Sequence, residues 1–206
     1  MADGTFHAAM RVLDALVDLA WGVETSREYR YGAHEAGRLR HADPYTNMPS
    51  YYARLLALRR FLALSSDDVV IDIGCGDGRA LAVFARAPVA RCIGIEFDGT
   101  AAAAARRNAA RLRGRRAPVD IVHGDAADYR FSAESVVYLF NPCGPASLRT
   151  VLANLKASLD RRPRRLRLCY YHPKHADVVE GAGWLRRTAT LRGLKTDIAV
   201  YEAGRQ

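Results

Sequence analysis

The sequence has few of the features that would place it in several common classes. Its four cysteines, Cys75, Cys92, Cys143 and Cys169, are widely spaced and form no C-x-x-C pair, which argues against a metal site or a disulfide framework. No apolar run approaches the roughly 18 residues of a membrane span. No basic segment precedes an apolar stretch at the N-terminus, so no signal peptide is evident. We therefore expect a cytoplasmic protein with no metal and no membrane partner.

Lysine is also scarce, although the chain is strongly basic. The formal net charge is +9 and lysine stands only at positions 156, 174 and 195, so arginine supplies almost all of the positive charge. The densest arginine patches, residues 106–116 and 161–167, have no interleaved aromatic side chains that would stack on bases. We therefore favour solvated surface over a nucleic-acid footprint, and nucleic acid stays an open alternative rather than the expected partner.

The most informative stretch is residues 69–79, with the sequence VVIDIGCGDGR. Four of its first five residues are β-branched and apolar, which predicts a strand covered on both faces. The turn Gly74-Cys75-Gly76 then leads into a helix, and such a turn presents backbone N–H groups to a ligand. The dinucleotide pattern G-x-G-x-x-G needs glycine or alanine at position 79, where Arg79 stands. The stretch therefore indicates an adenosine-bearing cofactor other than a dinucleotide.

Strands and helices alternate after the start of this motif. We expect strands near 69–73, 91–96, 119–123, 135–140, 166–171, 185–191 and 196–202, and helices near 79–86, 99–113, 146–159 and 174–180. This alternation predicts an α/β fold with a mostly parallel sheet and right-handed crossovers. The linker before the last strand, RGLK, is too short for a parallel crossover, so the last strand is expected to be antiparallel.

The first 60 or so residues differ, because they have no predicted strand and two helical patterns. One pattern spans about residues 6–19 and gathers apolar side chains in a single stripe made up of Val12, Leu13, Leu16, Val17 and Leu19. The other begins near Pro49, and the polar, tyrosine-rich segment between them is expected to be irregular. We predict a helical extension or lid over residues 1–64 and a cofactor-binding domain over 65–206, joined in one compact unit.

The glycine motif and its later counterparts resemble class I S-adenosylmethionine (SAM)-dependent methyltransferases. An acid precedes the first glycine, the second strand ends in an acid, the third is followed by G-D-A and the fourth by N-P. The segments GVET (22–25), DPYTNMPSYY (43–52), YLFNPC (138–143) and YYHPKHADVV (170–179) further resemble small bacterial methyltransferases related to protein-lysine methyltransferases. The resemblance covers about residues 65–202. It implies a Rossmann-like, seven-stranded sheet with helices on both faces, SAM as the cofactor and S-adenosylhomocysteine as the product.

The resemblance implies contacts to the methionine and ribose parts of SAM at the ends of the first two strands. Asp72 is expected to bind the methionine amino group, directly or through water. Gly74, Cys75 and Gly76 form the loop beside the methionine, where the glycines let the backbone approach closely. Glu96 is expected to accept both ribose hydroxyls. An exposed acid at a strand end is the structural alternative for Glu96.

Contacts to the adenine part are implied further along the chain. Phe97 is expected to flank the adenine, although a core position suits this aromatic almost as well. Asp125 is expected to accept from the exocyclic amine and the Ala126 N–H to face a ring nitrogen, while a helix N-cap is the other role open to Asp125. Tyr45 is expected to cover the cofactor, with packing against the domain as an equal alternative.

Asn141-Pro142 is the candidate catalytic pair. Methyl transfer is an in-line displacement that needs alignment and an available lone pair, and an Asn carbonyl can hold a target N–H and orient that lone pair. Related enzymes that methylate adenine or amide nitrogens have Asn-Pro-Pro-aromatic at this point, whereas Cys143 and Gly144 occupy the last two positions here. This departure argues against those targets and leaves a lysine amine open, with a plain strand-to-loop turn as the alternative.

The sequence therefore predicts an enzyme, a class I SAM-dependent methyltransferase acting on a nitrogen nucleophile, with a protein lysine as the candidate acceptor. Small-molecule methylation, RNA methylation and a non-catalytic SAM-binding module are the alternatives. His172 and His175 follow the fifth predicted strand, and either has the chemistry of a base near neutral pH. A structural role in a loop and helix start is favoured for both histidines.

Overall fold

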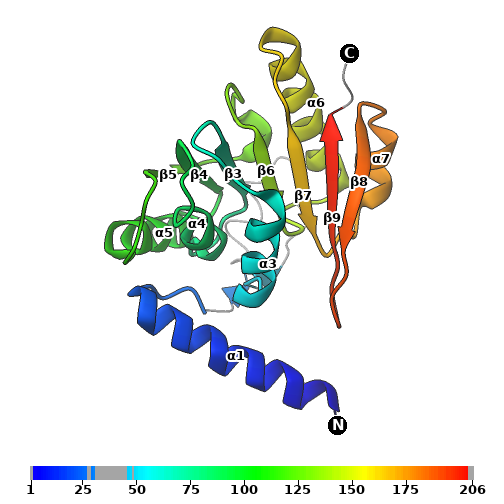
Figure 1. The fold of residues 1–206 in the computed structure, drawn as a ribbon. Helices are drawn as coiled ribbons and strands as arrows, with labels where there is room; N and C mark the ends of the chain where they lie inside the picture. Colours follow the sequence, from blue (N-terminus) through cyan, green and yellow to red (C-terminus); the bar gives the residue numbers. More distant parts are fainter. Residues whose placement is uncertain (1, 27–28, 31–45, 48, 204–206) are drawn as a thin grey trace.

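The computed structural model describes residues 2–26, 29–30, 46–47 and 49–203. Its centre is a seven-stranded sheet in the order β5-β4-β3-β6-β7-β9-β8 (Figure 1). Those strands are β3 (Val69–Ile73), β4 (Arg91–Glu96), β5 (Val119–His123), β6 (Val136–Leu139), β7 (Arg167–Tyr171), β8 (Leu185–Leu191) and β9 (Ile198–Ala203). The first five pair in parallel, and β9 runs antiparallel to both β7 and β8. The predicted Rossmann-like sheet with an antiparallel last strand is confirmed.

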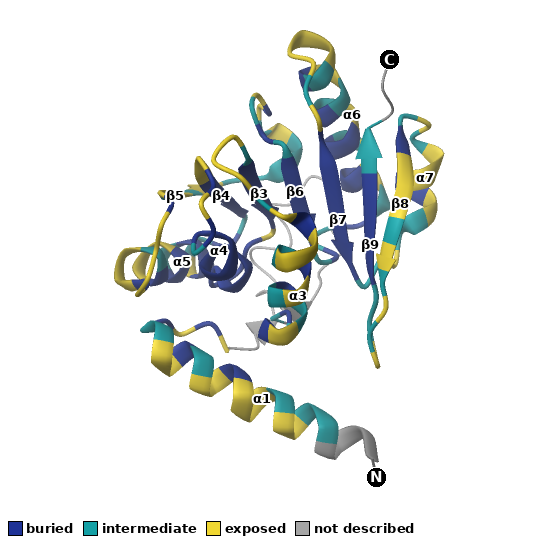
Figure 2. Ribbon diagram, viewed as in Figure 1, coloured by how far each residue is buried: buried dark blue, intermediate teal, exposed yellow. Residues whose placement is uncertain are grey.

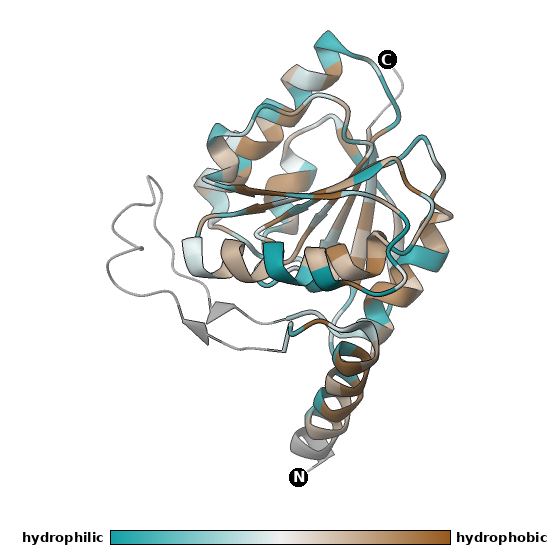
Figure 3. Ribbon diagram, turned by 90° about the vertical axis from the view of Figure 1, so that its left-hand side faces the viewer, coloured by the Kyte–Doolittle hydropathy of each residue, from teal (hydrophilic) through white to brown (hydrophobic). Residues whose placement is uncertain are grey.

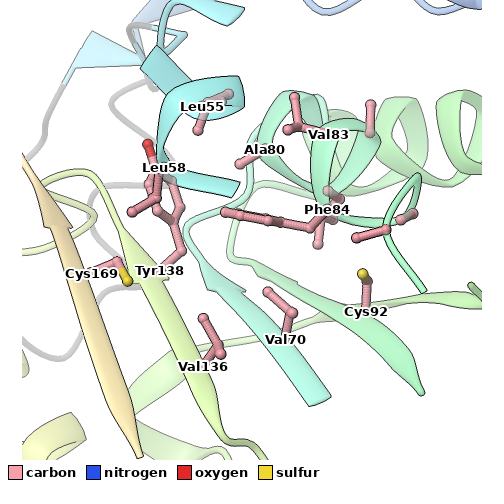
Figure 4. Packing of buried hydrophobic residues seen from close by; sticks show 14 of the residues in the cluster. Leu55, Leu58, Val70, Ala80, Val83, Phe84, Cys92, Val136, Tyr138 and Cys169 are labelled. Atoms are coloured by element: carbon pink, nitrogen blue, oxygen red, sulfur yellow. The ribbon is translucent and has the colours of Figure 1, made fainter. Parts of the chain in front are cut away.

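Helices cover both faces of this sheet (Figure 1). They are α3 (Tyr52–Leu62), α4 (Arg79–Phe84) and α5 (Gly99–Arg111) on one face, and α6 (Pro145–Arg161) and α7 (Ala176–Gly181) on the other. Successive residues of a strand point to opposite faces. Val70 and Tyr138 accordingly pack with Phe84 of α4 (Figure 4), whereas Ile71 packs with the α6 side. Two apolar cores, one on each face, thus hold the carboxyl ends of the parallel strands at a single edge of the sheet.

The N-terminal region lies at that edge. Helix α1 (Ala2–Trp21) runs beneath the ends of the parallel strands in Figure 1, with α3 between it and the sheet. The prediction of no strand among the first 60 residues was wrong, because two-residue strands β1 (Tyr29–Arg30) and β2 (Thr46–Asn47) pair antiparallel. Pairs this short carry no hydrophobic alternation that a sequence pattern would reveal.

Helix α1 is the most exposed element at this edge (Figure 2). Its predicted apolar stripe faces away from the domain at Val12, Leu13, Leu16 and Leu19, while Asp14 and Asp18 are buried. Within the described residues, no helix combines the length and the hydropathy needed to cross a bilayer.

Candidate functional site

The glycine loop between β3 and α4 has the backbone geometry that its composition predicts. Gly74, Gly76 and Gly78 adopt φ angles of 72°, 53° and 88°, a region that side chains other than glycine rarely enter. The Gly74 and Cys75 N–H groups both donate to the Ile95 carbonyl, at 2.9 and 3.0 Å, which ties the loop to the next strand. A Cβ at position 74 would lie 2.5 Å from the Pro142 Cβ, so the glycine loop and the loop after β6 touch here.

Asp72 lies in β3 just before this loop and is 3% exposed. Among the described residues, no donor or cation pairs with its carboxylate, which lines a cavity beside Gly74. Burial, and then the negative charge of Glu96, raise the pKa of Asp72 well above its ordinary value of 3.8. A buried carboxylate without a partner is costly in an empty protein. It is well suited to a ligand that brings a cation.

Glu96, at the end of β4, is partly paired within the protein. Its carboxylate accepts from the Gly76 N–H at 2.7 Å and from the Asp98 N–H at 2.9 Å, and the side chain is 1% exposed. The exposed strand-end acid considered as the alternative for Glu96 is therefore wrong. Phe97 is half-buried next to it, and its carbonyl is within 3.0 Å of His123 Nε2.

Asp125 follows β5 and caps a short 3-10 helix, Ala126–Asp128, by accepting from the Ala127 N–H at 2.8 Å. The N-cap alternative for this residue is thus confirmed. The cap occupies one carboxylate oxygen, and the adenine contacts of Asp125 and Ala126 stay predictions. Tyr45 lies outside the described residues.

Asn141 is the residue whose surroundings differ most from the expectation. Its Nδ2 donates to the His172 carbonyl at 2.8 Å, and its Oδ1 accepts from the Tyr170 hydroxyl at 2.7 Å. A longer bond of 3.4 Å joins the Lys174 N–H to the same oxygen. The carboxamide thus ties the end of β6 to the loop after β7, a contact that depends on the pairing of those strands and that the sequence does not reveal.

Asn141 and His172 both have positive φ angles, 45° and 50°, although neither is glycine. Such a conformation costs an L-residue on the order of 1–2 kcal/mol. Strain of this kind persists where the surroundings over-determine it, commonly at functional sites. Here the Asn141 amide holds the His172 carbonyl, while the His172 N–H donates to the Asp197 carbonyl at 2.8 Å.

A cavity of about 200 Å³ joins these features. It brings together Asp72, Gly74 and Cys75, at the end of β3 and in the glycine loop, with Asn141, Pro142 and His172 from the loops after β6 and β7. Glu96, Phe97, Asp125 and Ala126 are not among its lining residues and lie instead at the ends of the neighbouring strands β4 and β5.

Two further residues considered from the sequence fall outside this cavity. His175 is not among the lining residues, and it precedes α7 at the N-cap position. Cys143 is half-buried, and burial, with Asp125 as a further cause, raises its pKa to about 12, so it is a neutral thiol rather than a nucleophile.

The buried ion cluster around Arg79 was not predicted as part of the site. Arg79 Nη1 lies 2.7 Å from Asp14 Oδ2, and its other nitrogens donate to Thr25 Oγ1 and Ser26 Oγ, each at 2.8 Å. Asp18 accepts from Thr25 and, at 2.6 Å, from the Tyr52 hydroxyl. The signal was present as two acids four residues apart in an otherwise apolar helical stretch.

This cluster positions the N-terminal region against the cofactor loop. Arg79 also donates to the Ser50 carbonyl at 3.1 Å, and Thr25 and Ser50 both line the cavity. Asn108 adds a second link, since its Nδ2 donates at 2.8 Å to the carbonyls of both Glu24 and Asp77. Segments 22–25 (GVET) and 49–52 (PSYY) therefore meet at the guanidinium group of Arg79 and form one wall of the cavity.

The residues present fit SAM as a cofactor. The glycine loop takes positive φ angles at a strand end, Asp72 lines the cavity with a buried carboxylate that suits an ammonium, and Glu96 places a second buried carboxylate at the next strand end. These groups lie at the carboxyl ends of parallel strands, where ligands of open α/β sheets bind.

Comparisons with known proteins agree with this geometry. Residues 70–161 match the family model described as a methyltransferase domain. No protein of curated function matches the chain significantly.

Solved structures share the fold at low sequence identity. An RNA methyltransferase from Salinibacter ruber, in complex with S-adenosyl-L-homocysteine, is 20% identical with a TM-score of 0.59, over 77% of this chain and 95% of that one. A precorrin 8w decarboxylase from Methanobacterium thermoautotrophicum is 17% identical with a TM-score of 0.56, over 77% and 93%. A ribosomal protein L11 methylase from Lactobacillus delbrueckii subsp. bulgaricus is 14% identical with a TM-score of 0.59, over 86% and 82%.

The sheet order and the solved structures show that the chain has the Rossmann-like fold of methyltransferases. The chain carries a methyltransferase domain over residues 70–161, and the cofactor of such domains is S-adenosylmethionine.

Proposed function

We propose that this enzyme methylates a nitrogen nucleophile, and that a protein lysine amine is the acceptor to test first. The observation that carries this proposal is the Asn141 carboxamide, which borders the same cavity as Asp72 and Gly74. Its oxygen receives one short bond from Tyr170 and one long bond, 3.4 Å, from the Lys174 N–H. An acceptor N–H can replace the long bond without disturbing the short one. The resemblance of the sequence to methyltransferases related to protein-lysine methyltransferases supports the same acceptor.

The proposed cofactor contacts follow the strand ends. Asp72 binds the methionine ammonium, beside the loop Gly74-Cys75-Gly76, and Glu96, whose carboxylate also accepts from the Gly76 and Asp98 N–H groups, accepts the ribose hydroxyls. When bound, SAM supplies a methyl group activated by its positive sulfonium. The protein excludes water from that group and orients the acceptor lone pair.

The remaining contacts involve the adenine and the outer cover of the site. Phe97 flanks the adenine, Asp125 and Ala126 recognise its edge, and Tyr45 covers the cofactor. Pro142, in contact with Gly74, fixes the distance between the acceptor-side loop and the cofactor loop. The N-terminal helical extension, residues 1–64, forms the lid of the site.

Binding and transfer are tested separately. Calorimetry with SAM and with S-adenosylhomocysteine tests the cofactor site, and absence of binding to folded protein would contradict it. Incubation with tritiated methyl-SAM and size-fractionated lysate of the source organism then shows whether a protein, RNA or small-molecule fraction is labelled. Label confined to the RNA or small-molecule fraction would replace the lysine proposal with one of those alternatives.

The role of Asn141 is tested by Asn141→Ala and Asn141→Gly. Glycine keeps the positive φ of 45° without strain, so loss of transfer in both variants excludes backbone strain at this position as its cause. We expect transfer to fall at least ~100-fold while SAM affinity stays within about threefold. Asn154→Ala is the matched control, since Asn154 is half-buried on α6 and bonds the Ala127 carbonyl away from the cavity. Full transfer by both Asn141 variants would show that this residue is not catalytic.

A further inference from the structure

The imidazole of His172 lies at the cavity of the candidate site. His172 follows β7, is half-buried, and lines the cavity together with Asp72 and Asn141. Its ring packs against Phe140 in a T-shaped contact, with 6.3 Å between the ring centres. Within the described part of the chain, no group hydrogen-bonds this ring. The fold thus holds the imidazole by packing and by its bonded backbone rather than through its nitrogens.

The other described histidines lie elsewhere. His123 Nε2 is 3.0 Å from the Phe97 carbonyl, and His7, in α1, bonds a tyrosine hydroxyl. His175 comes only three residues after His172 but is not among the residues that line the cavity. Of these four histidines, His172 alone reaches the site, so the structure separates two residues that the sequence left equivalent.

A lysine acceptor needs a group that takes a proton from it. Methyl transfer uses the nitrogen lone pair, and a lysine ammonium has none. With an ordinary pKa of about 10.4, only about one lysine in 2,500 is neutral at pH 7. The Asn141 carboxamide can accept an N–H but does not take up the proton at neutral pH. A base is therefore needed beside Asn141.

The strands of the central sheet are largely hydrophobic (Figure 3), so a base must come from the lining of the cavity. Burial raises the pKa of the Cys75 thiol and of the Tyr138 phenol well above their ordinary values, so both stay neutral and are poor proton acceptors. Arg79 and Lys174 also line the cavity, and both are cations with no acceptor atom.

Two carboxylates line the cavity as well. Asp72 is proposed above to bind the methionine ammonium, and Asp77 belongs to the glycine loop between β3 and α4. A carboxylate is ordinarily a weaker base than an imidazole, with reference pKa values of about 3.9 and about 6.5. His172, whose carbonyl accepts from Asn141 Nδ2 at 2.8 Å, combines the stronger base with a place beside the acceptor-binding carboxamide.

Building on the proposed function, we propose that His172 is the catalytic base that takes a proton from the acceptor ammonium. An imidazole nitrogen binds one N–H proton of the lysine, and the electron pair of that N–H bond stays on the lysine nitrogen. This lone pair forms the N–CH3 bond while the S–CH3 bond of SAM breaks and its electrons return to sulfur. The products are a methylated ammonium and S-adenosylhomocysteine, and the imidazolium then releases its proton to water. An imidazole exchanges protons readily near neutral pH.

The test uses tritiated methyl-SAM, the protein fraction of the lysate and variants of the full chain. His172→Gly keeps the φ of 50° without strain and removes the ring. We expect its transfer at pH 7 to fall at least ~100-fold, as for a lost general base. Added imidazole should raise the transfer by about tenfold or more. SAM affinity, measured by calorimetry, should stay within about threefold.

A pH profile separates a base from a structural residue. From about pH 7 to about pH 9 the neutral fraction of a lysine rises about tenfold for each pH unit. Transfer by His172→Gly should follow that rise, whereas wild-type transfer should change little, because it uses the ammonium that predominates throughout. Both proteins share the other charged groups that line the cavity or bond to this loop, so their titration cancels in the ratio of rates: Asp72, Asp77, Arg79, Lys174 and Asp197.

A second variant and a matched control complete the test. His172→Asn also tolerates a positive φ and should show the same loss and the same pH profile, and circular dichroism checks that both variants are folded. His175→Gln is the control, since it removes an imidazole outside the cavity lining, and it should leave transfer unchanged.

The outcomes distinguish this role from the proposed function itself. Full transfer by His172→Gly, or a loss in both variants that higher pH does not relieve, would overturn the role of His172 while a labelled protein lysine still supports the proposed function. Wild-type label confined to the RNA or small-molecule fraction would overturn the proposed function, and with it a base for a lysine ammonium.

Discussion

Two sets of buried acids lie near the start of α4, and they differ in whether their carboxylates have partners within the protein. Asp14 and Asp18 belong to a closed cluster with Arg79, Thr25 and Tyr52, in which both acids have several hydrogen-bond partners. Asp72 is equally buried but faces a cavity with no partner among the described residues. From this contrast we expect the closed cluster to contribute to stability and Asp72, as proposed above, to contribute to ligand binding.

The largest expected effect comes from removing the cation of the closed cluster. Arg79→Met leaves two buried acids without their counter-charge, and we expect a loss of about 3–5 kcal/mol in the free energy of unfolding by urea. Arg91→Met is the matched control, because Arg91 and Asp120 also lie 2.7 Å apart but are 50% and 52% exposed. It should cost about 1 kcal/mol or less. Similar losses in the two variants would show that burial does not distinguish these ion pairs.

The next largest effect is expected on SAM affinity, from Asp72, the buried carboxylate that lines the cavity. Asp72→Asn keeps the size of the side chain and removes the charge that would meet an ammonium. We expect SAM affinity, measured by calorimetry, to fall about 10- to 100-fold, as for a charged hydrogen bond of about 1.5–3 kcal/mol. The unfolding free energy of the ligand-free protein should hold or rise, because a desolvated charge has been removed. A large loss of stability with unchanged SAM affinity would reverse the assigned roles.

A smaller effect is expected from a variant of the closed cluster that keeps its charges. Tyr52→Phe deletes the hydroxyl that donates to Asp18 at 2.6 Å and leaves the ring in the core. We expect unfolding to become easier by about 1–3 kcal/mol, the range for a lost hydrogen bond to a buried charged group. SAM affinity should stay within about twofold, because this hydroxyl does not reach the cavity lining. A tenfold loss of affinity would mean that the closed cluster also contributes to binding.

The effect that is smallest for each step measured is a pH dependence. Because the folded pKa of Asp72 is raised, the folded chain keeps a proton that the unfolded chain releases above about pH 3.8. Stability of the ligand-free protein therefore falls as pH rises from 3.8 through the raised pKa. Asp72→Asn has no such proton, so within this pH range its stability relative to wild type should grow by at most about 1.4 kcal/mol for each pH unit. Urea midpoints at several pH values provide the measurement, and a constant difference would contradict the assignment.

The sheet was largely predictable because its strands are buried, β-branched segments separated by periodic helices. The predicted strand 69–73 matches β3, and 91–96 matches β4. The antiparallel β9 followed from the short linker before it. The partners of Asn141 were not predictable, since Tyr170 reaches it only through the pairing of β6 with β7.

The packing of the N-terminal region was harder to predict from the sequence, for a physical reason. Helical periodicity shows which residues share a face, as it did for Val12 and Leu16, but it does not say which face meets the domain. Here a buried arginine decided the orientation, and that arginine lies more than 60 residues away in the chain. In the sequence, Arg79 is noticed only because it departs from the dinucleotide pattern, and Asp14 and Asp18 only because they interrupt an apolar run. No sequence pattern connects the three residues.

The contact between Gly74 and Pro142 has a consequence for how such sequences can diverge. A side chain at position 74 would collide with the proline ring, so the two positions are expected to change together rather than independently. A homologue with alanine in place of Gly74 should carry glycine in place of Pro142, or a displaced loop after β6. Paired substitution at these two positions in related sequences would then show that the glycine loop and the loop after β6 change their conformations together.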